Sequence, residues 1–282
     1  MPRDRFLTGL IGYPITHSAA PAMHEQAATA LGVRCHYQLI EVKGAGRDDL
    51  RAMLDGVRRL GFAGVNVTFP YKEAIVDLLD ELTPDARAIG AVNTVAVDGN
   101  RLIGHNTDAT GFARAIAPLL TAAPRGAIAL IGAGGVGKAI AFALAGLGAG
   151  EIRIFDANTD KAAQLAGQVQ GGVAVRSVAA AVDGAAGLIN ATPVGMLPSH
   201  DTPVPDALLH PAMWVADAVY TPLWTPLLSA AKAKGAAVLT GRDLAINAAA
   251  DAFALFTGMT PPAHVMANAF DAVMAARYAS PA

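Results

Sequence analysis

The sequence predicts an α/β protein of two domains, an N-terminal α/β domain with a mostly parallel sheet and a second domain that binds a dinucleotide. The first observation is that short apolar runs alternate with helical segments along most of the 282 residues. The second is a glycine-rich turn between two apolar runs, and the third is a wholly helical pattern from Leu244 onward. Strands that alternate with helices form parallel sheets covered on both faces, and this length suffices for two domains.

The glycine-rich turn directly follows the apolar run Ala127–Ile131. It places glycines in G-x-G-x-x-G spacing, and the Ala- and Leu-rich segment Lys138–Leu147, which lacks proline, predicts a helix after it. A second apolar run, Glu151–Phe155, ends at Asp156. This order of strand, turn, helix, strand and acid predicts a Rossmann dinucleotide-binding domain whose helix N-terminus faces the phosphates. The residues expected to contact the cofactor here are Gly132, Gly134, Gly135, Val136, Gly137 and Asp156.

Asp156 predicts NAD rather than NADP as the cofactor. A carboxylate at this position accepts hydrogen bonds from the adenosine ribose hydroxyls and repels a 2′-phosphate. The next four residues include no arginine that could bind that phosphate, although Lys161 is near. The glycines alone are a weak motif. Two other interpretations therefore stay open: a glycine-rich turn of another α/β fold with nothing bound, or an aspartate that is simply exposed at a strand end.

The composition argues against nucleic-acid and membrane partners. The chain has 21 basic and 23 acidic residues without a basic run, and its net charge is −2, so it has no electrostatic footprint for a polyanion. Its most apolar stretch, Gly126–Gly150, contains eight glycines and a lysine and suits a bilayer poorly. The single cysteine, Cys35, excludes an internal disulfide and is compatible with a cytoplasmic protein. We expect no metal, a small-molecule substrate, and a monomer or homodimer.

In the first domain, apolar runs bounded by turn residues predict strands, and longer segments with helical spacing predict helices. A proline in the first turn marks the start of one helix, and an Asp-Gly-Asn turn predicts a hairpin between the last two strands. The expected strands are Leu7–Ile11, Cys35–Glu41, Gly64–Thr68, Ala91–Val97 and Arg101–Gly104. The expected helices are Pro21–Leu31, Asp48–Leu60, Glu73–Leu79 and Asp85–Ile89.

A helix over Phe112–Leu120 and a linker over 121–125 are expected to lead into the Rossmann domain. From Leu244 the chain is helical with a break at Thr260-Pro261-Pro262, and we expect this piece to pack on the first domain. The expected domains are therefore residues 1–110 completed by 243–282, and residues 121–242. Beyond Asp156 the expected helices are Thr159–Gln168, Val178–Val182 and one that ends at Lys234. The expected strands there are Ala174–Arg176, Gly187–Ala191, Trp214–Ala218 and Val238–Leu239.

Several polar side chains of the first domain lie at or just beyond apolar runs. Parallel sheets bind ligands beyond the carboxyl ends of their strands, so these groups are expected to converge on one crevice. Each one alone is equally explained as a turn or capping residue, and Asn66, inside a strand, is more readily structural. The set is Ser18, Asn66, Thr68, Lys72, Asn93, Thr107 and Asp108.

The chain resembles the shikimate/quinate dehydrogenase family along nearly its whole length. The matching stretches run in order from Gly12 to Gly258 and are GYPITHS, GVNVTFPYK, GAVNTV, GHNTDATGF, IGAGGVGKA, NATPVGM, DAVYTPLWTPLL and DAFALFTG. The resemblance implies reversible hydride transfer between a nicotinamide cofactor and a ring hydroxyl of shikimate, quinate or a close cyclitol carboxylate analogue. Asp156 is similar to the aspartate of the NAD-using members.

The resemblance also implies roles for individual residues. Lys72 and Asp108 are expected to be the catalytic pair, because removing hydride from a carbinol leaves a proton that a nearby base must accept. His17 is expected only to order its loop. The other expected contacts are Ser18, Thr68, Asn93 and Tyr220 for the substrate, and Thr192, Met196, Ala218 and Gly241 for the cofactor.

Two positions depart from the family's pattern. Ala20 stands where the family usually has a serine or threonine that grips the substrate carboxylate, and Ala248 stands where it usually has a glutamine, with Asn247 beside it. Each missing hydrogen bond to a charged group weakens binding by about 1.5–3 kcal/mol. Two alternatives stay open: an NADP-dependent biosynthetic shikimate dehydrogenase, and a nucleotide-sensing paralogue whose substrate site has decayed.

Overall fold

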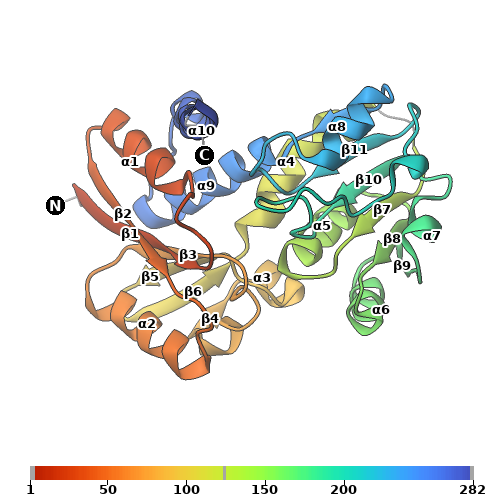
Figure 1. The fold of residues 1–282 in the computed structure, drawn as a ribbon. Helices are drawn as coiled ribbons and strands as arrows, with labels where there is room; N and C mark the ends of the chain where they lie inside the picture. The colour runs from red at the N-terminus through yellow and green to blue at the C-terminus, as the bar shows by residue number, and fades with distance from the viewer. Residues whose placement is uncertain (1–3, 123–124, 280–282) are drawn as a thin grey trace. The chain divides into compact units, whose positions relative to one another are not determined.

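The structure is a computed structural model that describes residues 4–122 and 125–279. It divides the chain into two compact units: unit 1 is Met1–Thr107 with Ile246–Ala282, and unit 2 is Asp108–Ala245. Figure 1 shows the strands and helices of both units. The linker expected over 121–125 is described only in part, because a helix continues to Ala122 and residues 123 and 124 lie outside the described ranges.

Unit 1 contains a six-stranded mixed sheet. Its strands are β1 (Arg5–Gly12), β2 (Arg34–Glu41), β3 (Gly64–Val67), β4 (Glu81–Leu82), β5 (Thr94–Asp98) and β6 (Arg101–His105). They are ordered β2-β1-β3-β5-β6-β4. β1 is parallel to β2 and β3, as the alternation of strands and helices predicts, whereas β5 is antiparallel to both of its neighbours. The predicted β5–β6 hairpin turns at Gly99, whose φ of 60° suits glycine.

Helices cover both faces of this sheet. They are α1 (Ala20–Ala30), α2 (Arg47–Arg59), α3 (Pro84–Ile89), α9 (Gly241–Thr257) and α10 (Ala263–Ala279). Ile11 of β1 packs against Leu50 and Leu54 of α2 on one face, and Leu10 packs beside the start of α1 on the other. Figure 1 shows the blue α10 next to the red α1, so both ends of the chain contribute to unit 1.

The prediction of an α-helix over Glu73–Leu79 is wrong. A 3-10 helix over Val76–Leu78 forms there instead, and β4, which follows it, was not expected. The carbonyl oxygen of Lys72 accepts a hydrogen bond from the backbone N–H of Val92 at 2.8 Å. Because that carbonyl is engaged outside its own segment, the turn tightens to i→i+3 hydrogen bonds and an α-helix does not propagate.

Unit 2 contains a second six-stranded sheet, in which every pair of neighbouring strands is parallel. Its strands are β7 (Ile128–Ile131), β8 (Ile152–Phe155), β9 (Gly172–Ala174), β10 (Gly187–Asn190), β11 (Trp214–Asp217) and β12 (Ala237–Leu239). Its helices include α4 (Thr107–Ala122), α5 (Gly135–Gly146), α6 (Thr159–Gln168), α7 (Val178–Val182) and α8 (Pro226–Ala233). The strands are ordered β12-β11-β10-β7-β8-β9. From β7 the chain adds β8 and β9 on one side and then β10, β11 and β12 on the other, and this switch in strand order confirms the predicted Rossmann type.

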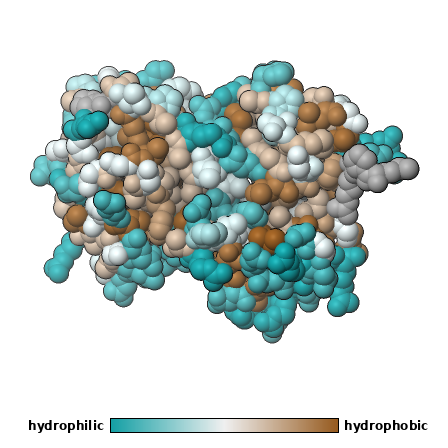
Figure 2. Space-filling model, turned by 180° about the vertical axis from the view of Figure 1, so that it is seen from behind, coloured by the Kyte–Doolittle hydropathy of each residue, from teal (hydrophilic) through white to brown (hydrophobic). Residues whose placement is uncertain are grey.

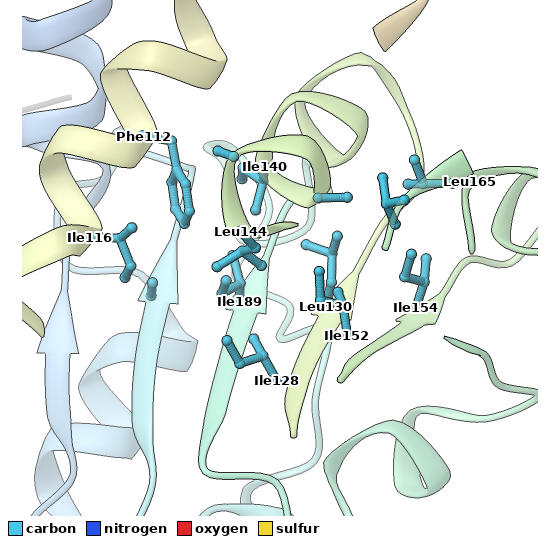
Figure 3. Close-up of a cluster of buried hydrophobic side chains, with 14 of the residues drawn as sticks. Phe112, Ile116, Ile128, Leu130, Ile140, Leu144, Ile152, Ile154, Leu165 and Ile189 are labelled. Carbon is cyan, nitrogen blue, oxygen red and sulfur yellow. The ribbon is translucent and has the colours of Figure 1, made fainter. Parts of the chain in front are cut away.

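The core of unit 2 fixes α5 against the sheet. Figure 3 shows side chains of α4 and α5 pointing toward side chains of the strands. Each large side chain buried in this way contributes about 1.5–3 kcal/mol, so the helix start is held firmly at the end of β7. The labelled members are Phe112, Ile116, Ile128, Leu130, Ile140, Leu144, Ile152, Ile154, Leu165 and Ile189.

The surface mixes polar and apolar residues, as Figure 2 shows for one face of the molecule. Among the described residues, the exposed large apolar side chains are Leu60, Phe69, Leu147, Val173, Trp224 and Leu255. Within residues 4–122 and 125–279, none of the helices combines the length and the apolar character needed to cross a membrane. In the same ranges no three His, Cys, Asp or Glu side chains are grouped so as to hold a metal ion.

His24 of α1 is fully buried in unit 1, and among the described residues neither of its ring nitrogens has a hydrogen-bond partner. The centre of its ring lies 4.6 Å from that of Tyr37, 5.8 Å from that of Phe253 and 5.9 Å from that of Phe256. Burial lowers the pKa of His24 from its ordinary 6.5 to about 3, because the imidazolium would lose its hydration among these rings. The folded chain therefore holds a neutral histidine here.

Replacing His24 with leucine is expected to make unit 1 less sensitive to acid. Between about pH 6.5 and 3 the unfolded chain binds a proton at His24 that the folded chain does not bind, so stability falls as the pH drops through this window. Between pH 7 and pH 5 the free energy of unfolding should fall by about 2 kcal/mol more in the wild type than in His24→Leu. Urea unfolding at the two pH values measures this difference.

The matched control is His264→Leu, which removes an exposed histidine of α10 in the same unit. This variant should keep the pH dependence of the wild type. If the wild type and His24→Leu lose equal stability between the two pH values, His24 is not the group responsible.

Candidate functional site

The glycine-rich turn joins β7 to α5 in a conformation that depends on its glycines. Gly132 has a φ of 108°, which L side chains rarely adopt, and a Cβ on Gly137 would overlap the Gly132 carbonyl oxygen. A Cβ on Gly134 would meet nothing within 4 Å. The first and third glycines thus close the turn against the helix, and the second leaves open space beside the backbone. That arrangement fits the approach of a pyrophosphate to the N-terminus of α5.

Asp156, directly after β8, holds the glycine turn through its carboxylate. Oδ2 accepts a hydrogen bond from the backbone N–H of Ala133 at 2.7 Å, and Oδ1 accepts one from that of Asn158 at 2.8 Å. Each carboxylate oxygen has a second lone pair that can accept a ligand hydroxyl. The residues of this segment therefore fit a dinucleotide, with the turn and helix start for its phosphates and Asp156 for its ribose.

A buried polar network ties together the carboxyl ends of β10 and β11. The carboxylate of Asp217, 3% exposed, accepts hydrogen bonds from Asn190 Nδ2 (2.9 Å), the Val219 N–H (2.9 Å) and the Thr225 hydroxyl (2.7 Å). Asn190 Oδ1 accepts from the N–H (3.0 Å) and the hydroxyl (2.7 Å) of Thr192. Because these bonds end on the loops that follow β10 and β11, they fix the paths of both loops.

Sequence reasoning missed this network. Burial raises the pKa of the Asp217 carboxyl to about 7, and the hydrogen bonds from Thr225, Val219 and Asn190 offset only part of that effect. A signal was present, because Asn190 and Asp217 are polar residues that each end an otherwise apolar four-residue strand. What the sequence lacks is the pairing, since these two residues are 27 positions apart.

The residues expected on the cofactor side of unit 2 lie around this network. A Cβ on Gly132 would lie 2.9 Å from the Thr192 methyl group, so the glycine turn and the loop after β10 are in contact. A Cβ on Gly241 would lie 2.7 Å from the carbonyl oxygen of Ala218, so the start of α9 meets the end of β11. Met196 is half-buried on the loop after β10. Tyr220, which is expected to contact the substrate, is half-buried on the loop after β11.

In unit 1, the loop after β1 carries Ser18 and is held by Glu41 at the end of β2. Glu41 Oε2 accepts hydrogen bonds from the N–H of Ile15 (2.7 Å) and from the N–H (2.9 Å) and hydroxyl (2.8 Å) of Thr16. These bonds lower the pKa of Glu41, and the bond from the Ile15 N–H has the largest effect. The Ser18 hydroxyl accepts from the N–H of Ala20 at 3.2 Å. Glu41, which sequence reasoning did not select, therefore positions the Ser18 loop.

Thr68 leaves β3 beside the end of β1. Its N–H donates to the carbonyl oxygen of Ile11 at 2.9 Å, and a Cβ on Gly12 would overlap the Thr68 methyl group. Because β1 and β3 are neighbouring parallel strands, Ser18 and Thr68 follow strands that end at the same edge of the sheet. That edge is where the sequence predicts a convergence of polar groups.

A buried polar cluster lies where β5 begins, opposite the end of β3. Asn93 is 6% exposed and Thr107 is 4% exposed. Asn93 Oδ1 accepts from the Thr107 N–H at 2.7 Å, and Asn93 Nδ2 donates to the Thr107 hydroxyl at 3.0 Å. Lys72 adjoins this cluster through its backbone, since its carbonyl oxygen binds the N–H of Val92, the residue before Asn93. Asp108, 9% exposed, directly follows Thr107 in the first turn of α4.

Comparison with known proteins matches both units. A sequence profile described as the shikimate dehydrogenase substrate binding domain matches residues 10–95. A second profile, described as NADP oxidoreductase coenzyme F420-dependent, matches residues 127–212. The first of these runs from the last residues of β1 to the first residues of β5 in unit 1, and the second covers the glycine turn and the strands around it.

Full-length relatives agree with these profiles. The chain is 43% identical over 271 residues to a shikimate dehydrogenase (NADP(+)) of Streptomyces avermitilis, with 93% of each protein covered. It is 40% identical over 282 residues to a quinate/shikimate dehydrogenase (NAD(+)) of Corynebacterium efficiens, with 96% of this chain and 99% of that protein covered. The structure of quinate dehydrogenase from Corynebacterium glutamicum in complex with NAD matches with a TM-score of 0.88 at 39% identity. That match covers 96% of this chain and 100% of the other.

A parallel sheet with a glycine turn and a strand-end aspartate, joined in one chain to a second α/β unit, is typical of a dinucleotide-binding protein of the Rossmann type, and the relatives place this chain among the oxidoreductases. The likeness to these relatives extends over more than nine-tenths of the chain. The chain belongs to the shikimate/quinate dehydrogenase family, whose members act on a CH–OH group.

Replacing Asp217 with asparagine is expected to remove a loss of stability at higher pH. The folded-state pKa of about 7 lies above the ordinary value of 3.8, so the folded chain binds the extra proton between these values and stability falls as the pH rises through this window. From pH 5 to pH 8 the wild type should lose about 2–3 kcal/mol more than Asp217→Asn, whose amide resembles the protonated acid. Tryptophan fluorescence during urea unfolding reports on this unit, because Trp214 and Trp224 both lie in it.

Asp183→Asn is the control, because it neutralises an exposed carboxylate of the same unit. It should follow the pH dependence of the wild type. A wild-type slope that survives unchanged in Asp217→Asn would mean that the carboxyl of Asp217 does not titrate in this range.

Proposed function

We propose that this protein is a dehydrogenase that prefers NAD to NADP and acts on a ring hydroxyl of shikimate, quinate or a close cyclitol carboxylate analogue. The observation that carries the proposal is the 2.7 Å hydrogen bond between Asp156 and the glycine turn, in a chain of this family. Relatives at 43% and 40% identity are named for shikimate and quinate and for both cofactors. The residues of unit 1 supply the polar groups that such a substrate requires.

A nicotinamide cofactor, when bound, supplies the acceptor for the hydride that leaves the substrate carbinol. The hydroxyl proton must leave as the carbonyl forms, and we assign its transfer to Lys72 with Asp108. The backbone of Lys72 is fixed by its bond to Val92, and Asp108 lies in the first turn of α4, where the helix dipole favours a carboxylate. The substrate's remaining oxygens are assigned to Ser18, Thr68 and Asn93, and a further substrate contact is assigned to Tyr220.

The preference for NAD rests on charge and on hydrogen-bond geometry. The two backbone bonds of Asp156 fix its carboxylate, so a 2′-phosphate would meet a negative charge that cannot turn away. A ribose with free hydroxyls would instead donate to the same oxygens. On the nicotinamide side, we assign the cofactor contacts to Thr192, Met196, Ala218 and Gly241.

An NADP-dependent biosynthetic shikimate dehydrogenase is the second candidate, because the Streptomyces avermitilis relative is named for NADP(+). A nucleotide-sensing protein with a decayed substrate site is less well supported. Lys72, Asn93 and Asp108 are all present, and the carboxamide of Asn93 keeps hydrogen bonds on both of its ends. A decayed site has no need of these groups.

Ala20 and Ala248 favour a weaker hold on the substrate carboxylate. Ala20 is half-buried at the first residue of α1, and Ala248, 9% exposed, lies in α9 of the same unit. Both offer only methyl groups where the family pattern has a hydroxyl and a carboxamide. Because the loss of one hydrogen bond to a charged group costs about 1.5–3 kcal/mol, we expect KM for the carboxylate substrates to be high.

Replacing Asp156 with alanine is expected to shift the cofactor preference toward NADP. Removing the carboxylate removes the repulsion of the 2′-phosphate and the acceptors for the ribose hydroxyls together. The ratio of kcat/KM with NADP to kcat/KM with NAD should rise at least about tenfold, which corresponds to one lost charge-assisted contact. Initial rates with shikimate and with quinate, followed by the absorbance of the reduced cofactor, measure the ratio.

Asp160→Ala, an exposed carboxylate in the first turn of α6, is the control and should leave the ratio unchanged. A wild type that turns over both substrates faster with NADP would contradict the NAD assignment. A wild type that binds NAD but turns over neither substrate would contradict the substrate assignment.

Lys72→Ala is expected to abolish turnover while sparing cofactor binding. A positioned acid–base group contributes about 10²–10⁴ in rate, so kcat should fall by at least about 100-fold. The Kd of NAD, measured by calorimetry, should not change. Lys234→Ala removes a lysine that donates to the carbonyl oxygens of Asp206 and Leu209 in unit 2, and its kcat should match the wild type. Near-normal kcat in Lys72→Ala would remove this residue from the catalytic pair.

A further inference from the structure

A chain of hydrogen bonds crosses the unit 1 sheet from β2 to the buried cluster at Asn93. It starts at Tyr37 of β2, which is 3% exposed and whose hydroxyl donates to Asn66 Oδ1 at 2.8 Å. β1 lies between β2 and β3, so the tyrosine side chain reaches across β1 to its partner. Asn66 Nδ2 donates to the Thr94 hydroxyl at 2.9 Å, and that hydroxyl donates to Asn93 Oδ1 at 3.1 Å.

The Thr94 hydroxyl links Asn66 to two groups of the cluster. Asn66 Nδ2 donates to the Thr94 oxygen, and this hydroxyl lies 3.1 Å from Asn93 Oδ1 and 3.1 Å from the Thr107 hydroxyl. Asn93 Oδ1 also accepts the N–H of Thr107 at 2.7 Å. Asn93 Nδ2 donates to the Thr107 hydroxyl at 3.0 Å, so both ends of the Asn93 carboxamide are held by its neighbours.

Two contacts from α1 hold Tyr37 itself. Its backbone N–H donates to Glu25 Oε1 at 2.9 Å, and the centre of its ring lies 4.6 Å from that of the buried His24. Neither contact involves the hydroxyl. A phenylalanine at this position would therefore keep both of these contacts and remove the hydrogen bond to Asn66.

We propose that Tyr37 is a positioning residue for the substrate: through Asn66 and Thr94, its hydroxyl helps to orient the Asn93 carboxamide in the proposed substrate site. This inference rests on the substrate role proposed for Asn93 and extends it across three strands. Without the tyrosine hydroxyl, Asn66 Oδ1 loses a donor in a half-buried position, and the amide is held less firmly in its bonds to the Thr94 hydroxyl (2.9 Å) and the Asn93 carbonyl oxygen (3.2 Å).

The test compares Tyr37→Phe with the wild type, using whichever of shikimate and quinate the wild type turns over. KM for that substrate should rise about three- to tenfold, the effect of one weakened neutral hydrogen bond, whereas kcat should stay within about twofold. KM for NAD should not change. Thr94→Val, which breaks the chain next to Asn93, should raise KM further, and the conservative variant Thr94→Ser should restore it toward the wild-type value.

Tyr71→Phe is the matched control. The Tyr71 side chain is 4% exposed in the same unit, and its hydroxyl donates to the Val42 carbonyl oxygen (2.7 Å) and accepts the Ala45 N–H (3.0 Å), away from the chain. This variant should lower Tm and leave KM unchanged. In a double variant, Tyr37→Phe should add nothing to the KM of Asn93→Ala, because Tyr37 acts only through Asn93.

The outcomes separate the two proposals. If Asn93→Ala raises KM and Tyr37→Phe does not, the positioning role of Tyr37 is wrong and the substrate role of Asn93 stands. If Asn93→Ala leaves KM unchanged, both roles are wrong. An equal rise of KM in Tyr71→Phe, or additive effects in the double variant, would show a general loss of stability and would also overturn the positioning role.

Discussion

A polar side chain buried at the edge of an apolar sheet must find its hydrogen-bond partners among its neighbours, and this requirement fixes the geometry at the carboxyl ends of both sheets. In unit 2 the buried Asp217 gathers Asn190, Val219 and Thr225 around one carboxylate. In unit 1 the buried Asn93 does the same with Thr94 and Thr107. An unpaired group at either place would cost about 1–3 kcal/mol, so the loops have little freedom to move away.

The second condition on the geometry of these loops is that backbone segments approach each other closely. Only glycine, which has no Cβ, allows this approach. A Cβ on Gly12 would overlap Thr68 in unit 1, and one on Gly132 or Gly241 would press on the loops after β10 and β11 in unit 2. At Gly134, by contrast, the space is open. The glycines of the turn thus differ in purpose: two bring protein segments together, and one leaves room for a ligand. Equal spacing in the sequence does not reveal this difference.

Local patterns predicted most of the fold. Apolar runs, proline in a first turn and the glycine spacing placed nearly every strand and helix within a few residues, because those signals act on the segment that carries them. The failures involve distant partners. The α-helix predicted over Glu73–Leu79 does not form, because the N–H of Val92 donates a hydrogen bond to the carbonyl oxygen of Lys72. The strand β4 forms only because β6 lies beside it.

The candidate site divides in the same way. Polar residues at strand ends, such as Asn93 and Asp156, could be selected from the sequence because each follows or ends an apolar run. Asp217 and Tyr37 were missed although their segments were placed correctly. Their importance comes from partners 27 and 29 positions away, and no local pattern records such a pairing. Asn66, which the sequence describes as more readily structural because it lies inside a strand, connects Tyr37 to the cluster at Asn93.

The balance of polar groups in unit 1 bears on substrate selectivity. In the proposed substrate site the carboxamide of Asn93 is held by hydrogen bonds with Thr94 and Thr107, whereas Ala20 and Ala248 present only methyl groups. Contacts with a charged group contribute more than neutral hydrogen bonds do, so their loss reduces affinity for every carboxylate substrate alike. Shikimate and quinate share that carboxylate and differ in the ring. On the proposed assignment, discrimination between them would depend on Asn93, whose orientation follows from its hydrogen bonds with Thr94 and Thr107.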